Sequence, residues 1–217
     1  MPGDYAIILN TGELDPITAQ KAAETGDMFH VRKWVMAGAN LFGGGHPRDV
    51  KLFQGIDAQE VTRFVLQGRK LLFDRLDDSD TKARDITALP GMAQYRKTRR
   101  MMGVQTLTAD AQGQRCERSI GVAIDFNRVG DVYEMPYEIL YAREVSNLFA
   151  AGRCVSSPGW AWAVTRVIPI AVATGEAAGT AAALCVQSGS DCAGLEIGML
   201  QRALRDQSDR LHIDEND

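Results

Sequence analysis

The sequence predicts a mixed chain of the α+β or α/β class, and three observations lead to this prediction. Residues 56–76 carry an apolar stripe at helical spacing. Three short segments rich in β-branched and apolar residues follow at 101–108, 119–126 and 131–136, with polar turns between them, which is typical of a β-meander. A last apolar segment, Asn147–Gly152, reads as a strand and leads into a long helix of small residues.

The first half of the chain contains two further predicted elements before its clearest helix. Tyr5–Asn10 is short and β-branched, which predicts a strand, and Asp15–Thr25 begins with Asp-Pro, which is typical of a helix start. Asp57 and Glu60 resemble a capping box at the start of the helix over 56–76. Its apolar stripe consists of Val61, Phe64, Val65, Leu71, Leu72 and Leu76.

The small-residue helix is expected to run from about Val167 to Gln187, with Gly189 just past its end. One side carries Ala171, Gly175, Ala178, Gly179 and Ala182. Because an interior glycine costs a helix about 1 kcal/mol relative to alanine, we expect a close neighbour at Gly175 and Gly179. That neighbour is a membrane helix, a sheet or a cofactor, and a leucine at either glycine is expected to overpack it.

Composition narrows the function classes. The 217 residues are 45% hydrophobic and 24% charged, as in a globular protein, and the net charge of −4 argues against nucleic acid as a partner. The apolar run between Arg166 and Glu176 is too short to span a membrane, and the N-terminus shows no signal peptide. The four cysteines form no C-x-x-C, which argues against a zinc or iron–sulfur site and predicts a reducing, cytoplasmic location.

The closing part of the chain resembles one known family. "NLFAAGRCVSS" (Asn147–Ser157), "TRVIP" (Thr165–Pro169) and "GEAAGTAAAL" (Gly175–Leu184) are similar to the last strand and helix of FAD-dependent oxidoreductases with the glutathione-reductase-like fold, which has two dinucleotide-binding domains. "YRKTRRMMGVQTLT" (Tyr95–Thr108) is similar to the family's R-x-x-R-R-x-x-G segment, and "YEMPYEIL" (Tyr133–Leu140) to the segment before the last strand. The resemblance covers most of residues 52–190.

This resemblance implies a partial FAD-binding, Rossmann-like domain joined to part of a β-rich substrate domain. Its expected boundaries are 1–140 for the substrate domain with its meander, 141–190 for the last strand and helix of the FAD domain, and 191–217 for a final helix and a frayed acidic tail. The implied cofactor is FAD, which would accept or donate a hydride in a reaction with a small organic substrate. The residues expected to bind the cofactor are Gly152, Arg153, Ser156, Arg166, Gly175 and Gly179.

Other candidate residues are less closely tied to the resemblance. The three arginines Arg96, Arg99 and Arg100 are candidates for binding a carboxylate or phosphate of the substrate, or form a solvated turn. Of the two tryptophans in "WAW" (Trp160–Trp162), we expect one in the core and one lining a crevice. His46 has the chemistry of a general base, but a lone histidine in a loop is expected to be structural, and no catalytic residue is predicted.

The strand–G-x-G-x-x-G–helix that opens such flavoproteins is absent from this sequence. Three possibilities stay open: a C-terminal fragment, one half of a split enzyme with a partner chain, or a degenerate chain without redox activity. The alternative function is that of a non-catalytic interaction subunit. We expect the isolated chain to be free of FAD. We also expect a homodimer, or a partner chain carrying the missing half, to bind around Ala171–Leu184.

Overall fold

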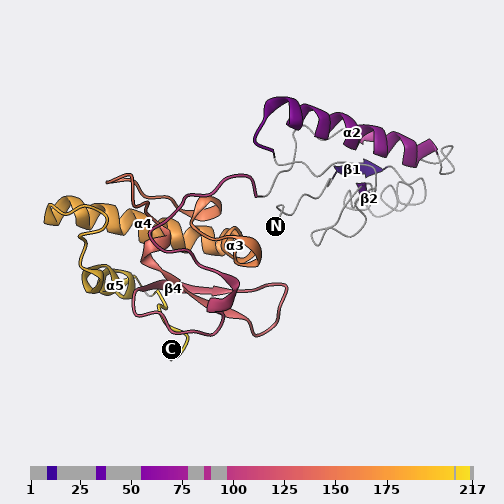
Figure 1. Ribbon diagram of the computed structural model, residues 1–217. Helices are drawn as coiled ribbons and strands as arrows, with labels where there is room; N and C mark the ends of the chain where they lie inside the picture. Colours follow the sequence, from indigo (N-terminus) through magenta and orange to yellow (C-terminus); the bar gives the residue numbers. More distant parts are fainter. Residues whose placement is uncertain are drawn as a thin grey trace, which may run out of the picture. The chain divides into compact units, whose positions relative to one another are not determined.

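The computed structural model describes residues 9–13, 33–37, 55–77, 86–88, 97–207 and 209–215 (Figure 1). The chain divides into two compact units, Met1–Thr98 and Arg99–Asp217, and each is described by itself. The expected domain boundary at 140/141 lies within the second unit.

The first unit contains a three-stranded antiparallel sheet. β1 (Leu9–Glu13) is its central strand, between β2 (Lys33–Ala37) and β3 (Ile86–Ala88). Of the predicted strand Tyr5–Asn10, the last two residues belong to β1, and the rest lies outside the described residues, as does the predicted helix Asp15–Thr25. β2 was not predicted, although its sequence KWVMA contains the tryptophan and valine that favour strands.

The helix expected over residues 56–76 is confirmed as α2 (Ala58–Asp77). The Asp57 carboxylate accepts a hydrogen bond from the Glu60 backbone N–H at 2.9 Å, and the Glu60 carboxylate accepts one from the Gly55 N–H at 2.9 Å. The first bond satisfies a backbone N–H that a helix start otherwise leaves unpaired, and the second fixes the residues before the helix, as a variant of the predicted capping box. Phe64, from the predicted apolar stripe, is buried.

The second unit contains an antiparallel hairpin, which confirms the last two strands of the predicted meander. β4 (Ser119–Ile124) pairs with β5 (Val132–Pro136) in a register that sets Val122 opposite Glu134. The register shifts between Ser119 and Val122, where Gly121 has a φ of +152° that other residues rarely adopt.

Two predicted strands are wrong. Met101–Thr108 forms only an isolated bridge, between Gly103 and Ala142, and Asn147–Gly152 forms only the bridge Tyr141–Phe149. The second segment begins at Asn147 with a φ of +54°, which is incompatible with a strand, and ends in a 3-10 turn over Gly152–Cys154. Both segments pair with loops and form no sheet; Leu107 is buried and Phe149 half-buried, whereas Met102 and Leu148 are exposed.

Three helices complete the second unit: α3 (Gly159–Thr165), α4 (Ile168–Ser188) and α5 (Ile197–Asp206) (Figure 1). The expected span of the small-residue helix is confirmed within one residue at each end. Gly189 ends it with a φ of +68° and donates its N–H to the Cys185 carbonyl, as predicted for a left-handed cap.

The packing expected of α4 is wrong in one respect. Gly175 and Gly179 are exposed, and a Cβ built on either meets no atom within 4 Å. The buried face consists instead of Ile170, Thr174, Ala177, Ala178, Ala181 and Cys185. The expected overpacking by leucine at Gly175 or Gly179 therefore does not apply within the second unit.

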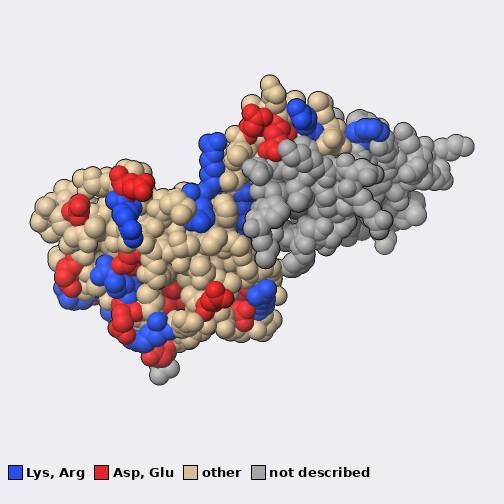
Figure 2. Space-filling model, in the orientation of Figure 1, with Lys and Arg blue, Asp and Glu red and all other residues tan. Residues whose placement is uncertain are grey.

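The outward face of α4, defined as Ile168, Val172, Gly175, Gly179 and Val186, is apolar, and the half-buried Glu176 beside it is the one charged residue of the helix. Among the described residues, α4 is long and apolar enough by length and composition to cross a membrane, so the expectation that its apolar run is too short is wrong; core helices of soluble proteins also pass this test. Figure 2 shows acidic and basic side chains interspersed on the second unit, with uncharged surface between them.

Replacing Gly175 or Gly179 with alanine is expected to stabilise the second unit by about 0.5–1 kcal/mol. An alanine restricts the unfolded chain more than glycine does and fits the helix without strain. Urea unfolding of G175A and G179A, followed by circular dichroism, measures the change. A loss of stability in both variants would show that something fills the space above these glycines.

Three aromatic rings form the centre of the second unit. The ring centroids of Tyr137 and Tyr141 lie 4.9 Å apart, and Phe149 packs on both. The Tyr137 hydroxyl donates a 2.8 Å hydrogen bond to the Cys192 carbonyl, which ties the aromatic cluster to the loop before α5. Burial raises the pKa of Tyr137 far above its ordinary value, so this hydroxyl stays protonated.

The C-terminal segment 209–215 is bound to the hairpin. Glu134 on β5 is buried and accepts hydrogen bonds from the Cys116 N–H at 2.7 Å, the His212 ring at 2.9 Å and the Ile213 N–H at 2.9 Å. Asp214 pairs with Arg115, and Glu215 pairs with Arg205. The prediction of a frayed acidic tail is therefore wrong for its first two residues, Asp214 and Glu215.

Candidate functional site

The candidate site is built on the loop Ala150–Pro158, which connects the aromatic centre to α3. The loop follows the segment 139–140, because the Ala150 N–H donates to the Leu140 carbonyl at 2.7 Å and the Ser156 N–H donates to the Ile139 carbonyl at 3.0 Å. Between these two bonds the chain turns at Gly152, whose φ is +66°. Glycine adopts this left-handed conformation without the steric cost that other residues incur.

Gly152 is fixed against the first turns of α4. Its N–H donates to the hydroxyl of Thr174 at 2.8 Å, and that hydroxyl in turn donates to the Ile170 carbonyl at 2.8 Å. A Cβ on Gly152 would lie 3.3 Å from the Cβ of Ala171. The close approach that the small residues of α4 permit is therefore made here, between Ala171 and Gly152.

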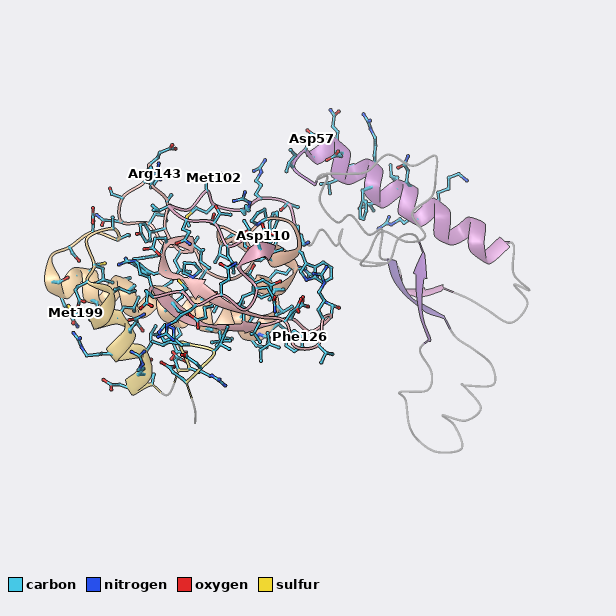
Figure 3. All side chains as sticks on the ribbon, turned by 60° about the horizontal axis from the view of Figure 1, so that its bottom comes forward. Asp57, Met102, Asp110, Phe126, Arg143 and Met199 are labelled. Atoms are coloured by element: carbon cyan, nitrogen blue, oxygen red, sulfur yellow. The ribbon has the colours of Figure 1, made fainter. Side chains whose placement is uncertain are left out.

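The segment 99–107 lies along the other side of the loop. The Met101 N–H donates to the Cys154 carbonyl at 2.8 Å, and the Leu107 N–H donates to the Ser156 carbonyl at 3.0 Å. This packing depends on Gly103, since a Cβ there would lie 2.7 Å from the carbonyl oxygens of Gln105 and Glu138 and from the Cβ of Ser156. Met102 and Arg143 lie on one side of the unit, beside the Gly103–Ala142 bridge (Figure 3).

The hydroxyl of Ser156 is buried between these segments. It shares a 2.9 Å hydrogen bond with the Thr106 hydroxyl, and Arg100 donates to it at 3.4 Å. Arg100 also donates to the Met101 carbonyl at 3.3 Å. Ser156 therefore connects one of the predicted substrate arginines to the loop that carries Gly152.

The turn between α3 and α4 lies next to this loop. Trp162 on α3 donates its indole N–H to the Arg153 carbonyl at 2.7 Å, while the Arg153 side chain is exposed. Arg166 is half-buried and caps the C-terminal end of α3. Val167, the residue before α4, has no side chain that can cap the helix. Pro169 has no N–H and the Ala171 N–H donates to the Val167 carbonyl, so the first turn offers a ligand at most the N–H groups of Ile168 and Ile170.

The two tryptophans have separate roles. Trp160 donates its indole N–H to the buried Asp125 carboxylate, and the Arg128 guanidinium lies 4.1 Å from the centre of its ring. Both Trp160 and Trp162 are half-buried, so the expectation of one core tryptophan is wrong. Phe126, in the turn between β4 and β5, is 66% exposed (Figure 3).

The structure brings several predicted site residues together and separates others. Gly152, Arg153, Ser156 and Arg100 are linked through one loop. Gly175 and Gly179 lie on the outward face of α4, and their role as cofactor contacts stays a prediction. Arg99 is exposed, and Arg96 and His46 lie outside the described residues.

Sequence reasoning missed three residues that shape the site: Gly103, Thr106 and Thr174. Gly103 is the glycine that ends the R-x-x-R-R-x-x-G segment, so a signal for it was present. Thr174 is the one hydroxyl on the buried face of α4 among alanines, which is a weaker signal. Thr106 has no sequence signal, because its partner Ser156 is 50 residues away.

Comparison with known families gives one family match. Residues 54–204 match the model of the FAD dependent oxidoreductase family, which is more than half of the chain. The chain belongs to this family. Members are oxidoreductases that use FAD, and the helices and two-stranded sheet of the second unit are consistent with part of an FAD-binding domain. No curated protein and no solved structure matches the chain.

The residues of this FAD-dependent oxidoreductase chain fit the flavin end of the cofactor in part. The uncapped N-terminus of α4 and the cationic Arg153 and Arg166 suit the negative charge that reduced flavin carries. The Gly152 N–H and the Ser156 hydroxyl are already bound within the chain, so these two residues shape the loop. No group of His, Cys, Asp and Glu within the described ranges could hold a metal ion.

Proposed function

We propose that this chain is the C-terminal part of an FAD-dependent oxidoreductase that transfers hydride between a small organic substrate and the flavin. The observation that carries the proposal is the family match, together with the loop Ala150–Pro158 held against the start of α4. When bound, FAD supplies the hydride chemistry. The chain supplies the positive end of α4 and the side chains of Arg153 and Arg166, which stabilise negative charge beside the ring.

The substrate side of the proposal rests on the arginines before Gly103. Arg100 is half-buried and fixed by Ser156, while Arg99 is exposed. An arginine held by such a bond binds a carboxylate or phosphate with a smaller loss of side-chain entropy than a free one. We therefore propose that Arg99 and Arg100, with Arg96, bind an anionic group of the substrate.

We also propose that the phosphates and adenosine of FAD are bound by a second half that carries G-x-G-x-x-G. The outward face of α4 is uncharged and includes Ile168 at 81% and Val186 at 85% exposed, which supports packing against such a partner. If a second copy of the chain binds this face instead, sedimentation of the isolated chain shows a dimer. V172K is expected to abolish either association.

The absorption spectrum of the purified chain tests the cofactor proposal. We expect a colourless protein that retains little added FAD, because the glycine-rich turn that neutralises two phosphates is missing. With the second half added, we expect a yellow complex. In that complex R153A and R166A are each expected to weaken flavin binding or slow flavin reduction by about tenfold or more, because each removes one charge-assisted contact.

R202A is the matched control, because Arg202 is exposed on α5 and pairs only loosely with Glu196 at 3.7 Å. Stoichiometric flavin on the isolated chain would overturn the need for a second half. Equal flavin affinity and reduction rates in R153A, R166A and R202A would overturn the roles of the two arginines.

A further inference from the structure

Two cysteines lie close together at the C-terminal end of α4. Cys185 is in the last turn of α4, and Cys192 is in the loop before α5; both are free and buried. The Cys185 thiol donates to the carbonyl oxygen of Asp191, the residue bonded to Cys192, at 3.4 Å. Standard backbone dimensions place the Cys192 Cα about 2.8 Å from that oxygen, so the Cys185 sulfur lies within about 6 Å of the Cys192 Cα.

The backbone around this pair is fixed from both sides. The Ser190 N–H donates to the Cys185 carbonyl at 3.0 Å, which closes the loop over the end of α4. The Cys192 carbonyl accepts the 2.8 Å hydrogen bond from Tyr137. The two cysteines are therefore held near each other by bonds that do not involve their sulfur atoms.

The pair is also accessible to a small molecule. Both cysteines line an open cavity of about 480 Å³, with Asn147, Phe149 and Val186 among the other lining residues. Cys154, by comparison, is exposed and lies in the candidate-site loop, with its sulfur against the Ala151 carbonyl.

We propose that Cys185 and Cys192 form a redox-active dithiol, which low-molecular-weight disulfides oxidise to an intramolecular disulfide. This inference does not depend on FAD or on the proposed second half. Its effect is to join the last turn of α4 to the loop before α5, next to the aromatic centre.

The reaction is two successive thiol–disulfide exchanges. The thiolate of one cysteine attacks the small disulfide, whose S–S bond breaks and releases one small thiol, leaving a mixed disulfide on the protein. The second cysteine attacks the protein sulfur of that mixed disulfide and releases the second small thiol. The protein loses two electrons and two protons, and one small disulfide becomes two small thiols.

Burial sets the rate of this exchange. It raises the pKa of Cys192, with the neighbouring Cys185 adding to the shift, so little thiolate is present at neutral pH. We expect oxidation at pH 7 to be slower than modification of exposed Cys154. The rate is expected to increase about tenfold per pH unit in this range, as the thiolate fraction does.

Mass spectrometry after equilibration with reduced and oxidised glutathione tests the proposal. No lysine or arginine lies between Arg166 and Arg202, so trypsin releases both cysteines on the single peptide 167–202, whereas Cys154 is on peptide 154–166. We expect peptide 167–202 to lose the mass of two hydrogen atoms. Peptide 154–166 is expected to gain one glutathione.

Two comparisons distinguish a structural pair from two unrelated thiols. The equilibrium constant for oxidation is expected to be at least about tenfold higher in the folded chain than in urea, because the fold holds the sulfur atoms together. In C185S the loss of two hydrogen atoms should disappear, while C116S should keep it. An equilibrium constant in the folded chain equal to or below that in urea, or separate glutathione adducts on both cysteines, would overturn the proposal.

Discussion

Replacing Gly103 with alanine is expected to destabilise the second unit by about 3 kcal/mol, at the upper end of typical overpacking effects. The new Cβ would lie 2.7 Å from two carbonyl oxygens and from the Ser156 Cβ, and backbone atoms cannot move aside as the end of a long side chain can. Urea unfolding monitored by circular dichroism measures the loss. Because Gly103 lies against the loop that carries Gly152, we also expect the complex with the second half to bind FAD more weakly.

G175A is the matched control for this substitution, because it makes the same chemical change where a Cβ meets open space. If G103A and G175A change the free energy of unfolding by the same amount, the segment 99–107 does not pack on the loop as the structure shows.

Replacing Glu134 with glutamine is expected to cost about 2–4 kcal/mol, in the range for leaving buried polar groups unsatisfied. One carboxylate oxygen accepts from Cys116 and His212, and the other accepts from Ile213. A carboxamide turns one of these oxygens into an N–H₂ group, so in either orientation a donor faces a donor. The C-terminal segment 209–215 should then detach before the rest of the unit unfolds.

The same contacts give the second unit a defined response to acid. Burial raises the pKa of Glu134, but the hydrogen bonds from Cys116, His212 and Ile213 outweigh burial and leave it below its ordinary value. Arg205 and two backbone N–H groups lower the pKa of Glu215 to about 2. A carboxyl whose pKa is lower in the folded state stabilises the fold fully above its unfolded pKa of about 4.5 and loses that contribution as the pH falls through the folded pKa.

We therefore expect stability to fall between about pH 4.5 and 2, and to fall less steeply in E134Q. E117Q is the matched control, because the Glu117 side chain is 86% exposed and its ion pair with Arg115 is worth little. Equal acid profiles for the wild type and E134Q, or an E117Q variant as unstable as E134Q, would contradict this account.

Local patterns in the sequence predicted α2, α4, α5 and the hairpin, whereas α3 was not predicted. α2, α4 and α5 carry their own signals, namely an apolar stripe, a cap or a terminal glycine, and those signals act within a few residues. The two strands that failed, 101–108 and 147–152, are apolar because they are packed on other segments, and an apolar run does not distinguish a strand from a buried loop.

The candidate site was predictable only in part, because its key contacts join distant residues. Gly152 was predicted as a cofactor-binding residue, and its positive φ and its contact with Ala171 place it at a turn beside α4. Its partner Thr174 is 22 residues later, and the position of Ser156 beside Thr106 depends on a packing partner 50 residues earlier. The direction in which Gly175 and Gly179 face depended on which side of α4 the hairpin covers, and no local pattern encodes that choice.

The bond between Glu134 and the segment 209–215 also sets the order in which this unit can form during synthesis. Glu134 leaves the ribosome 79 residues before Ile213, and until then its carboxylate has no partner from that segment. Before residues 209–215 are made, burying the Glu134 carboxylate would leave its charge without most of its hydrogen-bond donors, which costs free energy. The hairpin is therefore expected to remain exposed to water until that segment is present. The unit 99–217 is therefore expected to fold after its last helix has been made, so that nascent chains stalled before residue 210 remain sensitive to proteases throughout this region.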